Sequence, residues 1–533
     1  MIRNLARLSD ETFDAVVIGG GIYGLWTAHA LTTRGFSVAL LERRDFSGAT
    51  SFNSLKTVHG GIRALQHGSF ADTRQFVRER RALATLAPHL LRVMPFVVPT
   101  ARHPVRNRTA MRVFLRAYDA VAADRNHGVD PALHLPPSYT VGPRAARALN
   151  PLVDPDGLTG AAVWHDYQLH SPERLAIALV RTITEAGAAA ANYVEARGLL
   201  KHADRVSGVQ ALDLRTGASF DVRGRLVINA SGPWAWQLLA SCGIPVDRSS
   251  GFSLALNLVL DHPPRPHALG GVSKGRFLFL VPWRDRSILG TSHEGFVQGP
   301  DPSPVPADIS ALLRDGVEAF PHAGLNPASI RLVHRGLLPA RPAAATAHGA
   351  LLKRSIVRDH RADGVPGLLT VAGVRYTTAR ATAQQAADLC TEILGRPVTP
   401  PALAPLAGAA FNGLALYRQQ GQGQDRFVAR YGTLHTELPA DGRDPIAPDI
   451  DVTSSEILYA IRREMALTLS DVTLRRTDLA AGGHPGADAL RAAASVMAAE
   501  CGWTTGQTAD EIQAVERELT LETPAPSARK PSG

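Results

Sequence analysis

The chain has 533 residues, 45% of them hydrophobic, which predicts two or three domains with well-buried cores. Its three cysteines, Cys242, Cys390 and Cys501, lie too far apart for a disulfide framework or a cysteine metal site, so we expect no metal. The net charge of +9 is compatible with nucleic-acid binding, but the arginines are scattered and no nucleic-acid motif accompanies them. We therefore expect no nucleic-acid partner.

The N-terminal segment and the hydropathy pattern indicate where in the cell the protein is found. The first residues, MIRNLARLSDE, lack the apolar stretch of a signal peptide. No uninterrupted apolar run reaches the ~18 residues that cross a bilayer. Together with the few cysteines, these patterns favour a cytoplasmic protein.

A nucleotide-binding motif begins near the N-terminus. Residues 13–18 form a short apolar run typical of a buried parallel strand. Gly19, Gly21 and Gly24 then match the pattern GxGxxG and open a helix that we expect through residue 33. These glycines allow a tight turn, close approach of a pyrophosphate and close packing of helix on strand, and the helix N-terminus favours phosphate. Glu42 ends the next apolar run, where a carboxylate accepts hydrogen bonds from the ribose hydroxyls of a dinucleotide. The segment therefore predicts dinucleotide binding.

The segment that follows Glu42 favours FAD over a nicotinamide cofactor. A nicotinamide enzyme usually enters another strand–helix unit here, whereas residues 43–63 form a loop rich in small and hydroxyl side chains. The loop ends in Lys56, His59 and the pair Gly60–Gly61. It can lay hydroxyls and backbone N–H groups along a pyrophosphate and bring the glycine pair beneath a flat ring. An ordinary polar surface loop is the alternative interpretation.

Residues 106–121 mix apolar side chains with four arginines and predict an amphipathic basic helix. Such a helix can lie on an anionic bilayer. A solvated helix packed on its own domain explains the pattern equally well. Peripheral membrane contact therefore stays open, as does the oligomeric state, a homodimer included.

Later segments alternate between the nucleotide sheet and a second sheet. The runs at 225–234 and 367–372 end in small residues and return to the first sheet, and Thr377–Thr378 open a helix. A helix start beneath the flavin ring would stabilise the reduced flavin. The alternating stretches 252–260 and 277–289 predict an antiparallel sheet that walls the substrate site. Beyond residue 405 the composition becomes helical, and residues 522–533 are typical of a disordered tail.

These patterns predict a mixed α/β and α+β fold with interleaved domains. A discontinuous Rossmann-type FAD-binding domain comprises 1–95, 155–245 and 340–400. A substrate domain built on an antiparallel sheet, which would also face a membrane, comprises 96–154 and 246–339. A helical C-terminal domain comprises 405–521.

The sequence resembles the FAD-dependent glycerol-3-phosphate dehydrogenases and oxidases of the D-amino-acid-oxidase-like flavoprotein superfamily. The resemblance spans nearly the whole chain. The blocks that carry it are GGGIYG with Glu42, ATSFNSLKTVHGGIR (49–63), VINASGPWA (227–235), FLVPW (279–283), LGTS (289–292), AGVRYTTAR (372–380) and the helical tail 456–477.

The resemblance implies FAD as cofactor and hydride transfer from a substrate C–H bond to flavin N5. It implies a small-molecule alcohol as substrate, glycerol 3-phosphate among the candidates, with either quinone or oxygen as electron acceptor. It also implies that the contact of residues 106–121 with a membrane, if made, is with the inner face of the cytoplasmic membrane. Two alternatives stay open: a flavoenzyme of the same fold that oxidises a different alcohol or an amine, and a flavin-binding homologue without turnover that serves in an assembly.

The motifs and the resemblance together assign the site residues. Catalytic roles fall to Arg375, Arg358 and His59, and substrate contacts to Arg63, Asn257, His293 and Leu338. We expect cofactor contacts from Gly19, Gly21, Ile22, Tyr23, Gly24, Glu42, Arg43, Thr50, Ser51, Ser54, Lys56, His59, Gly60, Gly61, Val194, Ala230, Gly232, Trp234, Gly373, Arg375, Tyr376, Thr377 and Thr378.

Several substrate positions depart from the family pattern. Leu338 stands where the family has an arginine, and replacing that cation removes a charge-assisted hydrogen bond worth about 1.5–3 kcal/mol. The other departures are Asn257 for a histidine, Leu254 for a lysine, Ala64 for a tyrosine and His293 for an acidic residue. They predict a roomier, less cationic pocket in which glycerol 3-phosphate is a poor substrate, unless Arg335 or Arg341 points inward.

Overall fold

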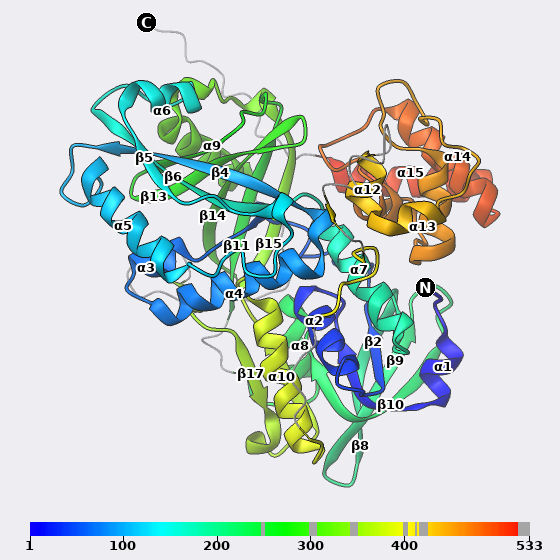
Figure 1. Ribbon diagram of the computed structural model, residues 1–533. Coiled ribbons are helices and arrows are strands. Elements are labelled where there is room, and N and C mark those ends of the chain that lie inside the picture. Colours follow the sequence, from blue (N-terminus) through cyan, green and yellow to red (C-terminus); the bar gives the residue numbers. More distant parts are fainter. Residues whose placement is uncertain are drawn as a thin grey trace, which may run out of the picture.

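The computed structural model describes residues 1–246, 251–297, 306–341, 350–397, 403–410, 413–414 and 425–520. These residues form two sheets with associated helices and a helical C-terminal domain (Figure 1). The predicted combination of an α/β nucleotide fold, an antiparallel sheet and a helical C-terminal domain is confirmed. The segment predicted to be a disordered tail lies outside the described residues.

The first sheet carries the nucleotide motif. Its core is parallel because each strand of this part is followed by a crossover rather than a hairpin. Helix α2 (Ile22–Thr32) packs against α7 (Pro172–Glu185) and α10 (Ala379–Ile393). The strands run in the order β17 (Ile356–Asp359), β18 (Leu368–Ala372), β10 (Ser219–Asn229), β1 (Thr12–Ile18), β2 (Val38–Leu41) and β7 (Ala189–Ala191), with β9 (Arg205–Asp213) and β8 (Val194–His202) pairing beside β10.

The second sheet is antiparallel except where β12 pairs with β4. Helix α9 (Pro306–Ala319) packs on β12 and β14, and α5 (Arg108–Val121) and α6 (Pro143–Leu149) pack on β6. The strand order is β16 (Ala350–Leu351), β15 (Ile330–Arg341), β11 (Gly251–Leu260), β14 (Arg286–Val297), β13 (Arg276–Trp283), β12 (Ala268–Ser273), β4 (Leu91–Ala101), β6 (Leu158–Leu169) and β3 (Thr57–Val58), with β5 (Tyr139–Val141) on β6.

Several strands that we placed in the nucleotide domain belong to the second sheet. Strand β6 falls in the segment 155–245, yet it pairs with β4 along its length in the second sheet. Residues 91–95, placed in the same domain, form the start of β4. Strands β3 and β16, from the segments 1–95 and 340–400, also pair in the second sheet. The reason is that β6 is buried on both faces over most of its length, so its apolar run looks like a strand of a parallel sheet.

The remaining helices pack beside the two sheets or form the C-terminal domain. None of the helices in the described part of the chain is long and apolar enough to cross a membrane. The N-terminal half contributes α1 (Leu5–Asp10), α3 (Ile62–Gln66), α4 (Phe70–Leu86) and α8 (Ala235–Ser241), and the C-terminal domain contributes α12 (Asp425–Tyr431), α13 (Ser454–Glu464), α14 (Ala487–Cys501) and α15 (Thr505–Leu519).

Buried ion pairs join the C-terminal domain to the nucleotide domain. The Asp45 carboxylate accepts hydrogen bonds from Arg475 and Arg476, each at 2.7 Å. Burial alone raises the pKa of Asp45, but the two guanidiniums outweigh burial and lower that pKa to about 2. Asp45 follows Glu42 by three residues, so the C-terminal domain holds the loop that follows the predicted ribose ligand.

Candidate active site

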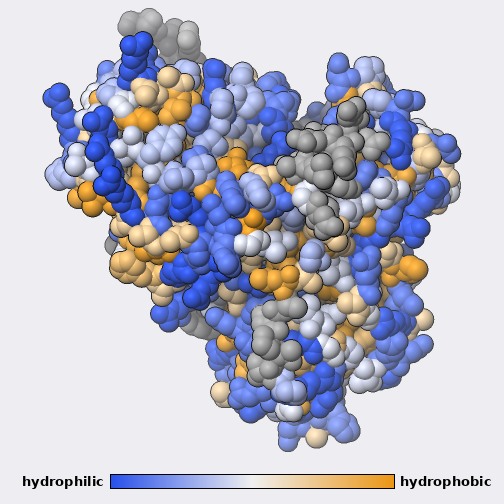
Figure 2. Space-filling view, in the orientation of Figure 1, coloured by the Kyte–Doolittle hydropathy of each residue, from blue (hydrophilic) through white to orange (hydrophobic). Residues whose placement is uncertain are grey.

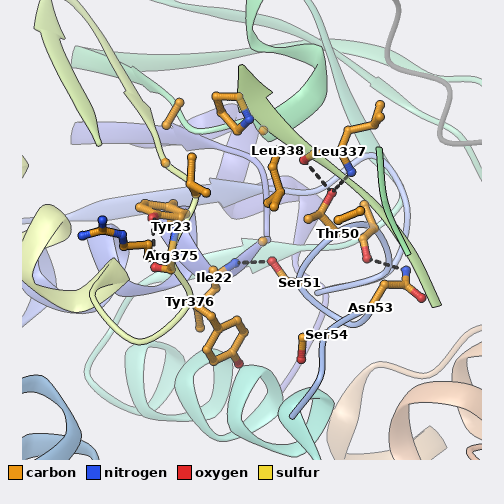
Figure 3. Close-up of a pocket in the computed structure, with 18 of the residues that line it drawn as sticks. Ile22, Tyr23, Thr50, Ser51, Asn53, Ser54, Leu337, Leu338, Arg375 and Tyr376 are labelled. Carbon is orange, nitrogen blue, oxygen red and sulfur yellow. Dashed lines mark hydrogen bonds between the residues drawn. The ribbon is translucent and has the colours of Figure 1, made fainter. Parts of the chain in front are cut away.

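A cavity of about 1410 Å³ is lined by residues of both sheets (Figure 3). Nearly all of the residues assigned from the sequence line it. The exceptions are Gly24, Gly60 and Thr378, which pack just behind its wall, and Arg358, which lies elsewhere.

The glycine loop between β1 and α2 forms one end of the cavity. Gly19 has a φ of +106°, and a Cβ on Gly24 would lie 1.9 Å from the Gly19 carbonyl oxygen, so these two glycines permit the turn and the helix packing. Gly21 differs from them, because a Cβ there would meet only the Ser51 Oγ at 3.3 Å. The Ile22 backbone N–H donates to that same Ser51 Oγ at 2.9 Å (Figure 3). A helix N-terminus beside bare backbone fits a pyrophosphate.

Glu42 is half-buried and directly follows β2, where a dinucleotide places its ribose. Its carboxylate accepts the Gly20 N–H at 2.6 Å and the Arg44 N–H at 2.8 Å. Burial raises the pKa of Glu42, and the two hydrogen bonds oppose that shift. A carboxylate has about four acceptor positions, so Glu42 retains capacity for ribose hydroxyls.

Beyond Glu42, the predicted adenosine neighbours close the same end of the cavity. The Arg43 guanidinium lies 4.7 Å from the ring centroid of Trp234, and both residues line the cavity. Val194 begins β8, and Ala230 and Gly232 follow β10; all three also line it. These residues come from three separate segments of the first sheet.

The loop at residues 47–58 forms the cavity wall and is not a surface loop. The Thr50 hydroxyl accepts the Leu337 N–H at 3.0 Å and donates to the Leu337 carbonyl at 3.2 Å, which ties the loop to β15 (Figure 3). Lys56 is buried and donates to the Phe52 carbonyl at 2.8 Å. Burial lowers the pKa of Lys56 to about 8. Ser54 lines the cavity beside these residues.

The turn before α10 forms the opposite wall. The Tyr23 hydroxyl donates to the Arg375 carbonyl at 3.0 Å and accepts the Arg375 N–H at 3.2 Å (Figure 3). A Cβ on Gly373 would lie 2.2 Å from the Tyr23 hydroxyl, so only glycine allows this contact. The Tyr376 hydroxyl is buried and has no hydrogen-bond partner among the residues that the structure describes. An unpartnered hydroxyl in a cavity wall is suited to a bound polar ring.

Arg375 and His59 line the cavity near this turn. The Arg375 guanidinium lies over the Phe76 ring at 5.3 Å and 3.6 Å from Asp72, so its charge is partly compensated. The His59 Nδ1 lies 3.7 Å from an Asp166 carboxylate oxygen, and the His59 N–H donates to Thr377 at 3.2 Å. Burial raises the pKa of Asp166, but His59 and Arg80 outweigh burial and hold that pKa below its usual value.

Gly60 and Gly61 shape the wall beside His59. A Cβ on Gly60 would lie 2.1 Å from the Arg80 guanidinium, and Gly61 caps α3 with a φ of +81°. The Gly60 N–H donates to the Asp166 carboxylate at 2.8 Å. Gly60 therefore supports the wall from behind, while Gly61 lines the cavity.

Strands of the second sheet form the side of the cavity that we assigned to substrate. Asn257 on β11 accepts a hydrogen bond from the Thr291 hydroxyl at 2.6 Å, and Leu338 on β15, opposite Ser253 of β11, lines the same cavity. Ala64 also lines the cavity, whereas Leu254 does not. Arg335 and Arg341 are exposed and do not line the cavity, so neither one supplies the missing cation.

A cation that we had not predicted does line this side. Arg276, the first residue of β13, lies 3.2 Å from Asp315 of α9 and faces the cavity together with Arg63. Burial, together with the charges of Arg63 and Arg276, lowers the pKa of His293 to about 4. Two arginines therefore line the same cavity as His293, which differs from the weakly cationic pocket that the sequence predicted.

The structure does not bring Arg358 to the cavity. Arg358 lies on the edge strand β17, where its Nε donates to Asp363 at 3.0 Å and 54% of its side chain is exposed. The catalytic role that we expected for it does not agree with this position. Alternate residues of a strand face opposite sides, and the sequence did not show which side Arg358 takes.

Comparisons with known proteins agree with this site. Residues 14–389 match a family model described as FAD dependent oxidoreductase, and residues 404–508 match the C-terminal domain of alpha-glycerophosphate oxidase. The chain is 28% identical to a glycerol-3-phosphate dehydrogenase of Synechocystis, over 96% of this chain and 97% of the relative. It is 31% identical to glycerol-3-phosphate dehydrogenase 2 of Mycobacterium bovis, over 95% and 88%.

A solved structure shows the same fold. The glycerol-3-phosphate dehydrogenase from Bacillus halodurans, complexed with FAD, superposes with a TM-score of 0.74 at 21% identity. The match covers 96% of each chain. The arrangement of two sheets and a helical C-terminal domain is therefore shared over nearly the whole length.

Proposed function

Because the chain belongs to the FAD dependent oxidoreductase family and is homologous to glycerol-3-phosphate dehydrogenases, we propose that it oxidises a small alcohol that carries a phosphate group. Glycerol 3-phosphate is the first substrate to test. The observation that carries this proposal is that Arg63 and Arg276 face the same cavity that contains the glycine loop and Glu42. A site for an anion thus lies in one cavity with the site for FAD.

The residues present fit FAD. Gly21 leaves backbone bare beside the N-terminus of α2, and Glu42 retains acceptor capacity for a ribose. When bound, FAD accepts a hydride from the substrate carbon. The protein's own residues bind the anion through Arg63 and hold the hydroxyl near Asn257 or His59. Leu338 and the cavity-lining phenylalanines of β13 exclude water.

The proposal is tested by comparing glycerol 3-phosphate with glycerol as reductants of an artificial electron acceptor. We expect turnover with the phosphate ester and at least ~100-fold lower kcat/KM with glycerol, because glycerol cannot form charge-assisted hydrogen bonds with Arg63. Replacing Arg63 with methionine should remove most of that preference. Equal rates for the two alcohols, or turnover with neither, would contradict the proposal.

One observation favours a second candidate, oxidation of a different alcohol. The uncharged Leu338 and Asn257 line the wall where the resembled enzymes have an arginine and a histidine. A substrate with a longer or less polar body between its phosphate and its hydroxyl would fill that side better. Faster turnover of such an ester than of glycerol 3-phosphate would favour this candidate.

Arg375 is proposed to act at the flavin edge of the cavity. Replacing it with methionine keeps much of the packing over Phe76 but removes the charge beside Asp72. We expect flavin reduction to slow by about tenfold or more while FAD stays bound. Stopped-flow absorbance measures the rate, and protein denaturation measures the FAD content. Loss of FAD with a normal rate in the remaining holoenzyme would show that Arg375 is only structural.

We also propose that α5 and the loop before it contact an anionic membrane. Val105 and Val113 are 68% and 66% exposed, and Arg112 and Arg116 are exposed on the same helix. Figure 2 shows hydrophilic side chains projecting beside a hydrophobic patch in this region. We expect the protein to sediment with vesicles containing anionic lipid, and Val113→Asp to weaken this binding. Equal sedimentation of the two proteins would exclude the contact.

A further inference from the structure

Three cavity-lining side chains from separate elements form the cationic end of the substrate side. Arg63 lies in the first turn of α3, Arg276 begins β13, and His293 lies on β14. The Arg63 guanidinium lies 5.6 Å from the centroid of the Phe277 ring, which orients it. No carboxylate pairs with Arg63 within the described parts of the chain, so its charge is available to a ligand.

His293 has an unused ring nitrogen at this end. Its Nδ1 is buried and has no hydrogen-bond partner among the described residues. Burial and the charges of Arg63 and Arg276 lower the pKa of His293 to about 4. The ring is therefore neutral near pH 7, because a third positive charge beside the two guanidiniums is unfavourable.

The other charged groups around His293 leave an excess of positive charge. Asp315 of α9 compensates Arg276 at 3.2 Å, and Lys274 in the hairpin between β12 and β13 lies 3.8 Å from the same carboxylate. Glu318 lies 3.9 Å from Lys274 at the exposed side. Strand β11, which pairs with β14, carries no titratable side chain. Among the described charged groups around His293, Arg63 is thus the cavity-lining cation without a carboxylate partner.

We propose that Arg63, Arg276 and His293 form one subsite for a phosphate dianion, and that anion binding is coupled to uptake of a proton by His293. This inference rests on the proposed function, since it specifies which residues recognise the phosphate of the substrate. A dianion beside the two arginines offsets the field that keeps the imidazole neutral. The imidazole then takes a proton from solvent and keeps it, and its unpartnered ring nitrogen donates a hydrogen bond to a phosphate oxygen.

The physical consequence is a linkage between pH and affinity. If the bound anion raises the pKa of His293 above the working pH, the protein takes up a proton on binding, and affinity rises as pH falls. Binding takes up a proton at pH values between the pKa of His293 in the free protein, about 4, and its pKa in the complex. Below pH 4 the imidazole is charged in both states, so the coupling disappears.

Calorimetric titration of the FAD-loaded protein with inorganic sulfate tests the inference. Sulfate stays a dianion near pH 6, whereas inorganic phosphate is mostly a monoanion there and would release the proton that His293 takes up. At about pH 6, below the ordinary histidine pKa, titrations in two buffers of different ionisation enthalpy give the number of protons taken up. We expect a value approaching one for the wild type and none for His293→Gln, which should still bind sulfate more weakly. The control His103→Gln changes an exposed histidine outside the cavity lining and should keep the wild-type value.

A second variant tests the arginine pair. Arg276→Met should weaken sulfate binding by about tenfold or more, since it removes a charged donor. Sulfate binding without proton uptake in the wild type, or unchanged uptake in His293→Gln, would overturn the inference. Failure of the proposed function gives a different result: proton uptake on sulfate binding, without flavin reduction by glycerol 3-phosphate, would retain the subsite and reject the substrate.

Discussion

Replacing Gly21 with valine should give a folded protein that does not retain FAD. Gly21 has φ −77° and ψ 176°, a conformation that a β-branched residue adopts readily, so the substitution does not strain the backbone. Its Cβ would meet only the Ser51 hydroxyl, and the rest of the side chain would occupy the space before the N-terminus of α2. That space is where we place the pyrophosphate. Loss of two charge-assisted hydrogen bonds there corresponds to about a hundredfold weaker binding.

The measurement is the flavin content of purified protein, read by absorbance and by release on denaturation. Gly506→Ala is the matched control, because Gly506 is exposed on α15 and a Cβ there would meet only the Thr504 hydroxyl at 3.9 Å, an ordinary van der Waals distance. We expect the control to retain FAD fully. If the Gly21 variant were as yellow as the wild type, the pyrophosphate would lie elsewhere and the assignment of the glycine loop would be wrong.

The second large effect should come from Asp45→Asn. Removing this carboxylate leaves Arg475 and Arg476 as buried cations without their common partner, which costs about 3–5 kcal/mol of stability. We expect a clear fall in the thermal or urea midpoint. FAD retention should also weaken, because Asp45 anchors the loop that follows Glu42 to the C-terminal domain.

The pH dependence gives an independent check of this ion-pair network. The pKa of Asp45 is about 2 in the folded protein, below its usual value of 3.8. A lowered folded-state pKa contributes stability that is fully present above pH 3.8 and is lost as the pH falls towards 2. The Asp45→Asn variant should lack this part of the acid dependence.

Asp388→Asn is the control for the network. Asp388 pairs with Arg34 but is 51% exposed, and a pair of this kind contributes about 1 kcal/mol or less. We therefore expect little change in its unfolding midpoint. Equal midpoints for the Asp45 and Asp388 variants would mean that the buried network does not hold the two domains together.

The cofactor end of the cavity could be predicted because its signals are local. Gly19, Gly21 and Glu42 lie within one strand–helix–strand segment, and their spacing fixes where each one lies on the sheet edge. The loop at 47–58 follows directly, so its contribution to the same wall was also accessible from the sequence. The fold class followed from the same alternation of nucleotide strands with antiparallel runs.

The substrate end could not be predicted in the same way, because its residues meet through the pairing of distant strands. Arg276 and Arg63 come from different elements, and nothing near either residue indicates that both approach His293. Arg358 shows the converse case. Its neighbourhood matched the resembled family, but it lies on an edge strand and pairs with Asp363 outside the cavity.

The sheet to which β6 belongs and the partners of Asp45 also could not be predicted from neighbouring residues in the sequence. Strand β6 resembles a nucleotide-sheet strand in its apolar run, and only its pairing with β4 assigns it to the second sheet. The ion pairs of Asp45 join residues that are 430 and 431 positions apart in the chain. A charged residue in an apolar context indicates a buried partner, but it does not identify that partner.

The absorbance spectrum of the purified, oxygen-free protein during addition of glycerol 3-phosphate tests the account most directly. With no electron acceptor present, the flavin can be reduced only by the added substrate. We predict that the oxidised flavin absorption disappears on addition of the phosphate ester and stays unchanged on addition of glycerol. A spectrum that glycerol 3-phosphate leaves unchanged, in protein whose flavin dithionite reduces fully, would contradict the proposed function.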